Sequence, residues 1–319
     1  MKRIGAIGLL LALLLTVLPF TGCLAKNAYR KEANTGQNAG VYPYLVRMPS
    51  ATWYLAKDDI ELLGEEAFYE GLYAILDDAE ADMKDAREAL SGYIADEIEP
   101  IDIYTDFTGK AEIAKAASAY YNGTGNFIKL FSGWETVRIA FLHEYVHYLT
   151  MHCAQPATRF GFWAEGMADY VANFLCRNRL GRSAEMGFDI AEYPPFLREQ
   201  AWDASENSID PRKLDIGLGA LAAGGALIGR SYYAVMNDMI VRTEQMEADL
   251  KPNQLSLCEA SGMIAYLTET YGRDTVFKNW DLDPDRMETV YGKSFSELYR
   301  DWAAWNRIQC ESLGIKVGE

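Results

Sequence analysis

The hydrophobic and polar positions change their period along the chain. Residues 59–96 carry apolar residues at helical spacing with acidic residues between them, which predicts one or two amphipathic helices. Two short runs follow, IDIYTDF at 101–107 and NFIKLF at 126–131, and both are typical of strands. The helical period then returns and predicts helices at 136–152, 164–177, 217–229, 254–271 and 295–308. We therefore expect an α+β protein, with an α/β part over 41–155 and a helical part over 156–319.

The chain opens with an apolar run that is typical of a targeting signal. Lys2 and Arg3 precede the uncharged stretch IGAIGLLLALLLTVLPF, which has the basic and apolar regions of a secretory signal. We expect residues 1–22 to direct export. Residues 23–40 are polar and rich in small residues, so we expect them to form a tether outside the fold.

The end of this run resembles the bacterial lipobox. It reads FTGC, in which Phe20 stands in place of the usual leucine and Gly22 precedes Cys23. The resemblance implies an acylated Cys23 that anchors an exported protein to the extracytoplasmic side of the cell membrane. Two alternatives stay open. Ordinary signal peptidase would cut after Ala25, or the run would remain as a membrane anchor, because about 20 apolar residues span a bilayer.

The net charge of the chain limits the classes of partner that it can bind. The sequence has 30 Lys and Arg against 46 Asp and Glu, a formal net charge of -16. Such a surface repels phosphate backbones, so nucleic-acid binding has no support.

Besides Cys23 the chain has four cysteines, which in an exported protein can be oxidised or can remain as buried thiols. Four thiols allow three pairings, and the sequence does not choose among Cys153, Cys176, Cys258 and Cys310.

The stretch HEYVHYLTMH holds all three histidines of the chain. On a helix, His143 and His147 lie one turn apart on one face, so both imidazoles can bind one zinc ion at about 2.0–2.1 Å. Glu144 lies one step around the helix, where its carboxylate can take a proton from metal-bound water. His152 is half a turn out of phase and does not join this face. The alternative is a pair of structural histidines that hydrogen bonds satisfy.

A catalytic zinc site of this kind needs a third protein ligand. The extended motif H-E-x-x-H-x-x-G-x-x-H needs glycine at 150 and histidine at 153, whereas the chain has Thr150 and Cys153, so only a Cys153 thiolate is left for that pattern. The segment RFGFWAEGMADY offers Glu165 instead, near the start of a predicted helix. Asp169, one turn further on, can hydrogen-bond the outer nitrogen of a ligand histidine. The alternative is an acidic, solvated start of a helix.

These two segments together resemble the gluzincin metallopeptidases, especially the bacterial peptidase MA-like group. The second segment of that group reads Trp-x-x-Glu-Gly-x-Ala-x-Tyr, and Glu165, Gly166, Ala168 and Tyr170 match it in register, with Phe162 in place of the tryptophan. The resemblance implies a zincin-like fold with a small mixed sheet, two active-site helices and a mostly helical C-terminal half. It also implies a Zn²⁺ cofactor, Glu165 as the third ligand and an aspartate, here Asp169, that supports a histidine.

The resemblance implies a zinc endopeptidase that acts on peptide or protein substrates, with Glu144 as the general base. Tyr232 and Tyr233 lie in the interval where related enzymes place an oxyanion-stabilising tyrosine, and core packing is the alternative for both. The run NFIKLF is expected at the sheet edge along which an extended substrate lies. Two alternatives stay open for the whole chain, a non-catalytic surface lipoprotein with this fold and a zinc hydrolase of a non-peptide substrate.

Overall fold

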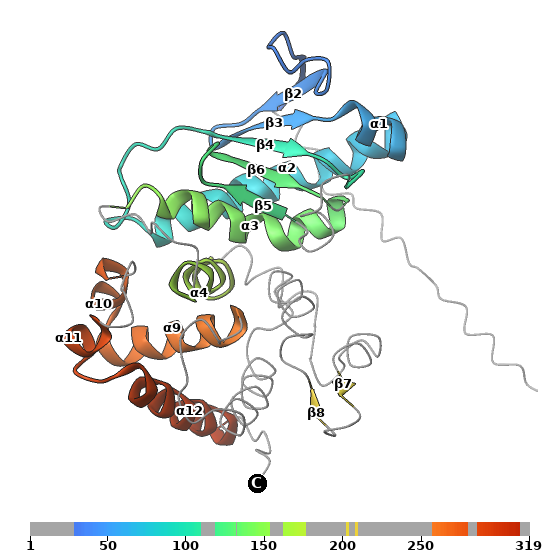
Figure 1. Cartoon of the computed structure of the whole chain (residues 1–319). Helices are drawn as coiled ribbons and strands as arrows, with labels where there is room; N and C mark the ends of the chain where they lie inside the picture. The colour runs from blue at the N-terminus through green and yellow to red at the C-terminus, as the bar shows by residue number, and fades with distance from the viewer. Residues whose placement is uncertain are drawn as a thin grey trace, which may run out of the picture.

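The computed structural model describes residues 29–109, 119–131, 133–153, 162–176, 257–279 and 286–312, with two short paired strands, β7 (Trp202–Asp203) and β8 (Ser208–Ile209). These residues form a mixed α/β protein around one six-stranded sheet (Figure 1), in agreement with the expected α+β class. The signal at 1–22, Cys23 and the helix expected at 217–229 lie outside the described residues. No helix within the described ranges combines the length and apolar character that crossing a bilayer requires.

The sheet is mixed, as expected. Its strand order is β1-β2-β3-β4-β6-β5, with bounds β1 (Lys31–Ala33), β2 (Tyr44–Arg47), β3 (Ala51–Leu55), β4 (Ile101–Thr105), β5 (Ala119–Asn122) and β6 (Phe127–Leu130). β3, β4 and β6 run parallel, while β1, β2 and β5 pair antiparallel with their neighbours. Parallel neighbours need a long crossover connection. Helices α1 (Lys57–Leu63) and α2 (Glu65–Ala89) lie in the crossover from β3 to β4.

The edge strand beside the candidate site differs from the expectation. NFIKLF forms β6, which pairs with β4 on one side and β5 on the other, so its expected edge position is wrong. The edge strand is β5, with the sequence AYYN. Asn122 begins the turn NGTG, where its Oδ1 accepts a 2.7 Å hydrogen bond from the Gly125 amide. This turn closes a hairpin, and the four-residue strand before it carries too little alternation to be recognised alone.

The fold also begins before the end of the expected tether. Within 23–40, residues Lys31–Ala33 form β1 and pair with β2. All three side chains of β1 are exposed, so the polar composition that resembles a tether belongs here to a charged edge strand. Lys31 Nζ lies 3.1 Å from Glu65 Oε1 and 4.2 Å from the ring centroid of Tyr69. These contacts connect the strand to α2.

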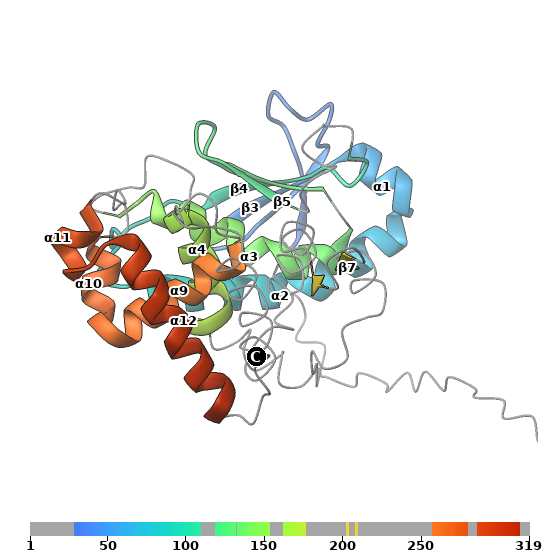
Figure 2. The same ribbon diagram turned by 60° about the horizontal axis from the view of Figure 1, so that its bottom comes forward.

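Helices α2 and α3 (Trp134–Thr150) lie together on one face of the sheet (Figure 2). The sheet side chains Trp53, Ile103 and Ile128 are fully buried and share a hydrophobic core with both helices. The amphipathic helices expected over 59–96 are confirmed as α1 and α2. Gly64 separates them with φ at +80°, a conformation that glycine adopts at little cost.

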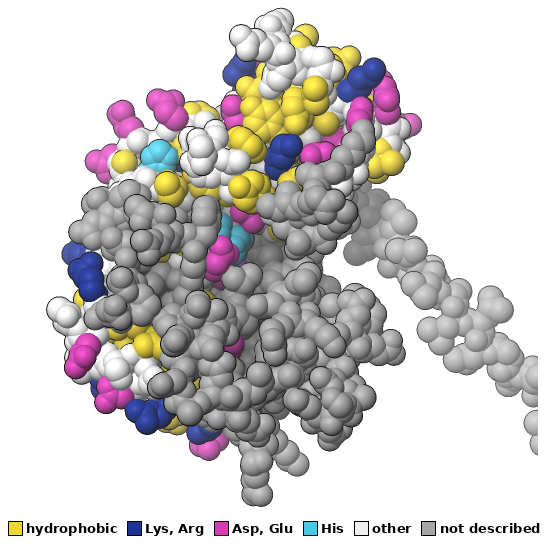
Figure 3. Space-filling model, viewed as in Figure 1, with side chains coloured by type: hydrophobic (Ala, Val, Ile, Leu, Met, Phe, Trp, Pro, Cys, Tyr) yellow, Lys and Arg dark blue, Asp and Glu magenta, His cyan; other side chains and the backbone are white. Residues whose placement is uncertain are grey.

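The opposite face of the sheet carries aromatic side chains. Tyr54 and Tyr104 stand on neighbouring strands with their rings stacked at a centroid distance of 4.7 Å. Phe127 packs edge-on against Tyr104 at 5.5 Å. These side chains are half-buried, and Figure 3 shows hydrophobic side chains gathered over the strands at the top of the view. The two faces of the sheet therefore differ, since one is buried under helices and the other is partly exposed to solvent.

A group of helices lies on the far side of α3 from the sheet (Figure 1). It consists of α4 (Phe162–Tyr170), α9 (Leu257–Tyr271), α10 (Arg273–Lys278), α11 (Met287–Tyr291) and α12 (Phe295–Ser312). The helices expected at 136–152, 164–177, 254–271 and 295–308 are confirmed, with their ends shifted by a few residues. The one exception in type is the end of the second, where α4 passes into a π-helix, Val171–Leu175.

Candidate metal centre

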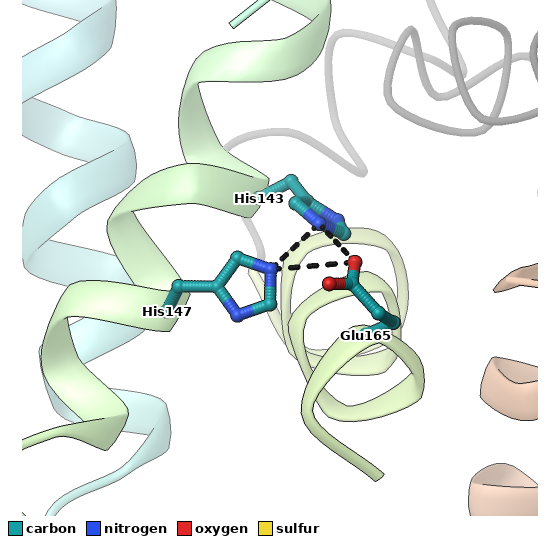
Figure 4. Close-up of side chains that lie close together, drawn as sticks. All are labelled: His143, His147 and Glu165. Atoms are coloured by element: carbon teal, nitrogen blue, oxygen red, sulfur yellow. Dashed lines mark hydrogen bonds and ion pairs between the residues drawn. The ribbon is translucent and has the colours of Figure 1, made fainter. Parts of the chain in front are cut away.

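Two helices bring His143, His147 and Glu165 together (Figure 4). His143 and His147 project from one face of α3, and Glu165 projects from α4 toward both. His143 Nε2 lies 2.9 Å from His147 Nε2 and 3.1 Å from Glu165 Oε2, and His147 Nε2 lies 3.4 Å from the same oxygen. Within the described residues this is the group of acidic, histidine or cysteine side chains that could hold a metal ion. The predicted ligand trio is therefore assembled.

The packing of the two helices explains why the three side chains converge. On α3 the neighbouring residues Tyr145, Val146 and Leu149 are fully buried in the core. A rotation of the helix that moved the histidines away from the site would therefore expose these core side chains. On α4 Gly166 lies against the backbone of Ala260 in α9, where a Cβ would be 2.8 Å from the Ala260 carbonyl carbon. Glu165 precedes this contact. The glycine that matches the family pattern thus sets the distance between α4 and α9.

The site is only partly enclosed. The side chain of His147 is 5% exposed, that of His143 12% and that of Glu165 26%. Figure 3 shows a histidine beside an acidic side chain at the surface below the sheet. Of the three side chains, Glu165 is therefore the one most open to solvent.

Asp169 supports His143 from behind, as predicted. Its Oδ1 lies 2.7 Å from His143 Nδ1, and the aspartate is 1% exposed. Burial lowers the pKa of His143, but Asp169 and then Glu165 and Glu144 outweigh it and raise this pKa well above its usual value. When Nδ1–H donates its hydrogen bond to Asp169, Nε2 is the nitrogen that a metal can bind in place of a proton. The carboxylate therefore selects the tautomer that a ligand needs.

Glu165 is held as an anion. Burial alone raises its pKa, but the hydrogen bonds and charges of His143 and His147 lower it far below the usual carboxyl range. An ionised carboxylate next to two imidazoles is a ligand set for divalent transition metals. The cluster has the charge and the donor types that such an ion requires.

Glu144, the predicted base, lies beside this cluster and is not one of its three donors. Its side chain is half-buried, and its Oε2 accepts a 2.7 Å hydrogen bond from the backbone amide of Tyr121 in β5. The charge of Glu144 contributes to the raised pKa of His143, so the carboxylate is within electrostatic reach of the site. The sequence did not indicate the Tyr121 contact. The one sequence feature that could have pointed to a strand at this place was the hairpin turn that follows AYYN.

Helix α3 continues where the extended motif would turn. Thr150 is helical, and its hydroxyl donates a 2.7 Å hydrogen bond to the His147 carbonyl. Cys153 follows the helix and forms a β-bridge with Ile94, while burial raises the pKa of its thiol to about 12. Such a thiol is a poor metal ligand at neutral pH. Cys153 does not belong to the cluster.

His152 also lies apart from the cluster, as its helical phase predicts. Its ring packs edge-on against Tyr148 at a centroid distance of 4.8 Å, and its carbonyl accepts a hydrogen bond from the Ala95 amide. Burial, and after it the charge of Arg87, lowers its pKa. Tyr232 and Tyr233 lie outside the described residues, as does the Cys258 side chain, so the predictions for these residues stay predictions.

Fold and site together define a mixed α/β protein with a His-His-Glu cluster on two packed helices. Comparison with protein-family models, with curated proteins and with solved structures gave no match. The resemblance to gluzincins therefore rests on the motif residues alone.

Proposed function

We propose that this chain is an exported zinc endopeptidase of the gluzincin kind. One observation carries the proposal. His143, His147 and Glu165 converge from two helices, and Asp169 holds the outer nitrogen of His143 at 2.7 Å. Three ligands with an oriented histidine are the arrangement of catalytic zinc sites, which keep one position open for water. The alternative, an acidic and solvated start of a helix, does not account for a buried Asp169 that is hydrogen-bonded to a histidine of the cluster.

The spacing of the donors supports zinc. Two donors held at about 2.0–2.1 Å from one tetrahedral zinc ion lie roughly 3.3 Å apart. The distances within the cluster are 2.9, 3.1 and 3.4 Å. Only small side-chain adjustments separate this arrangement from a zinc-binding one. When bound, zinc supplies Lewis-acid activation of a water and of the scissile carbonyl.

The residues around the cluster support hydrolysis. Glu144 accepts the proton of the attacking water and later delivers it to the leaving amine, which is the role of a general base and acid. Glu165 lies against both ligand histidines and Asp169 against His143, and these contacts orient the two rings. Tyr232 or Tyr233 would stabilise the oxyanion.

A peptide substrate is supported by the position of β5. This strand is the terminal one of the described sheet and lies next to α3, which carries the histidines. An open strand edge can pair with an extended peptide through backbone hydrogen bonds. The proposed substrate is therefore an extended segment of a peptide or protein.

We also propose that the protein is attached to the membrane through Cys23. The lipobox-like FTGC motif supports this proposal. Cys23→Ser is expected to release the protein from membranes, because stable attachment depends on the acyl chains. Intact-mass analysis of membrane-extracted protein tests it, and an unmodified N-terminus at Lys26 would contradict it.

Zinc content and peptide cleavage of purified variants test the function. The wild-type protein should bind about one zinc ion and cleave members of a peptide library, and a chelator should abolish cleavage. Glu165→Ala should lose zinc and activity together. Glu144→Gln should keep zinc while turnover falls roughly 10²-fold to 10⁴-fold. His152→Ala, outside the cluster, is the control.

Each outcome separates the proposal from an alternative. Zinc binding without cleavage of any peptide would favour a non-catalytic protein that binds a partner. Chelator-sensitive hydrolysis of non-peptide substrates alone would favour a different zinc hydrolase. Full zinc occupancy in Glu165→Ala would remove this residue as a ligand, and unchanged turnover in Glu144→Gln would remove the mechanism.

A further inference from the structure

Glu144 is attached to the sheet through a backbone amide. Its Oε2 accepts a 2.7 Å hydrogen bond from the amide of Tyr121. The bond joins α3 to β5, which are neighbours in the fold. The two bonded residues are 23 positions apart in the sequence. A hydrogen bond to an ionised carboxylate is stronger than one between neutral groups. This contact therefore restricts where the carboxylate of Glu144 can lie.

The Tyr121 amide is available because β5 ends the sheet. Tyr121 stands opposite Ile128 of β6, and residues of an antiparallel pair alternate between facing the partner strand and facing away from it. Since the amide of Tyr121 binds Glu144, its N–H and C=O face away from β6. Groups on an edge strand that face outward normally bind water or another chain. Here the amide binds a side chain of the same protein.

Tyr121 itself is firmly placed. Its side chain is 1% exposed, and its hydroxyl donates a 3.1 Å hydrogen bond to Asn126 Oδ1 in the hairpin turn. Its ring contacts Tyr148 of α3 at a centroid distance of 6.2 Å. A donor fixed by the hairpin and by α3 offers little freedom to the group that it binds.

We infer that the Tyr121 amide is a positioning group for Glu144. It holds one carboxylate oxygen and leaves the other for proton transfer in the proposed reaction. The catalytic part of this inference rests on the proposed function, whereas the hold on Glu144 does not. A peptide that lies along β5 consequently pairs with the outward carbonyl of Tyr121, while the amide stays with Glu144.

A double-mutant cycle on the metal-free protein tests the hold. Tyr121→Pro removes the N–H, and Tyr121→Ala is the matched control because it removes the same ring and keeps the N–H. The outward N–H of an edge strand is a position where proline is tolerated. Each variant is combined with Glu144→Ala, and the folding equilibrium constant is measured by chemical denaturation. We expect the effect of Glu144→Ala to be about 10-fold larger in the Tyr121→Ala background than in the Tyr121→Pro background.

Equal effects of Glu144→Ala in both backgrounds would overturn the inference. Amide hydrogen exchange at Tyr121, followed by NMR, gives a second measurement that needs no proline and stays decisive if the proline variant does not fold. The bond should protect this amide, so exchange should be at least about 10-fold faster in Glu144→Ala than in wild type. Glu144→Gln, which keeps an acceptor oxygen, should lie between them. An unchanged exchange rate in Glu144→Ala would also overturn the inference.

Kinetics of the zinc-loaded enzyme test the catalytic part. Compared with Tyr121→Ala, Tyr121→Pro should lower kcat roughly 10-fold or more and change KM less than about 2-fold. Equal kcat values in the two variants would overturn the positioning role. If the wild-type protein cleaves no peptide but the cycle shows coupling, the proposed function and the catalytic part fail together, and the hold on Glu144 is supported.

Discussion

Gly166 of α4 and Ala260 of α9 meet with no space for a side chain between them. A Cβ on Gly166 would lie 2.8 Å from both the carbonyl carbon and the Cβ of Ala260. The contact lies next to Glu165, so the packing of α4 on α9 and the position of the third proposed ligand depend on the same residue.

Gly166→Ala should therefore destabilise the protein and weaken metal binding. Overpacking of a tight contact typically costs about 1–3 kcal/mol, and moving α4 away from α9 displaces Glu165. Chemical denaturation and a zinc competition titration measure the two effects. Gly40→Ala is the control, because a Cβ there meets nothing within 4 Å. Wild-type stability in Gly166→Ala would show that α4 and α9 are not packed at this distance.

Removing the support behind His143 should lower metal affinity. Asp169→Ala is expected to weaken zinc binding by roughly 10-fold to 100-fold, the usual effect of losing a carboxylate that orients a ligand histidine. Asp169→Asn keeps an acceptor for Nδ1–H without the charge and should fall between. Competition with a chelator of known affinity gives the values. Equal affinity in wild type and Asp169→Ala would mean that His143 needs no orientation from Asp169.

The buried carboxyl of Asp59 should make stability depend on pH. Burial raises its pKa, and hydrogen bonds from Phe107, Thr105 and Thr108 only partly offset this. The native state then holds the proton more tightly than the unfolded state does. The contribution of Asp59 to stability is therefore full below the unfolded pKa of about 3.9 and declines as pH rises through the folded pKa.

Asp59→Asn removes this titration. The free energy of unfolding of the variant minus that of wild type should increase between about pH 4 and pH 7, because only the wild type incurs the cost of a buried charge. Denaturation at both pH values measures the difference, in which unchanged groups cancel. Parallel pH profiles for the two proteins would contradict the raised pKa.

Shortening the chain should show where the fold begins. A chain that starts at residue 29 keeps β1, whereas one that starts at residue 35 loses β1 and Asn34. The side-chain amide of Asn34 donates a 2.7 Å hydrogen bond to the Tyr42 carbonyl. We expect the shorter chain to lose about 1–3 kcal/mol of stability, since several hydrogen bonds are removed. Denaturation of both chains gives the comparison. Equal stabilities would mean that residues 31–34 do not contribute to the fold and belong to the tether.

The proposed site was more accessible to sequence reasoning than the sheet that supports it. Helical periodicity alone places His143 and His147 on one face. Glu165 could be found because the next predicted helix follows closely and carries an acidic residue in its first turn. These are local rules, and the structure brings the three residues together as they predict. The finer assignment to a zincin fold rests on the resemblance and remains a proposal.

The missed features depend on pairing between distant segments. Whether NFIKLF or AYYN ends the sheet is decided by hydrogen bonds between strands, which side-chain alternation in one strand does not reveal. The same holds for the polar residues of β1, whose exposed pattern is shared by tethers and edge strands. The hold of Tyr121 on Glu144 uses a backbone amide, so no residue type could have indicated it.

The two ends of the described six-stranded sheet both carry features that oppose continuous strand pairing with a second copy of the protein. At one end β1 is short, and its exposed residues include Lys31 and Glu32. Charged side chains on an edge strand disfavour pairing with another strand. At the other end Glu144 binds an outward amide of β5. Replacing Glu144 by a small apolar residue would leave a backbone donor open at that edge. Variants of this kind should consequently self-associate more readily than the wild-type protein, and Glu144→Gln, which keeps an acceptor, should do so less.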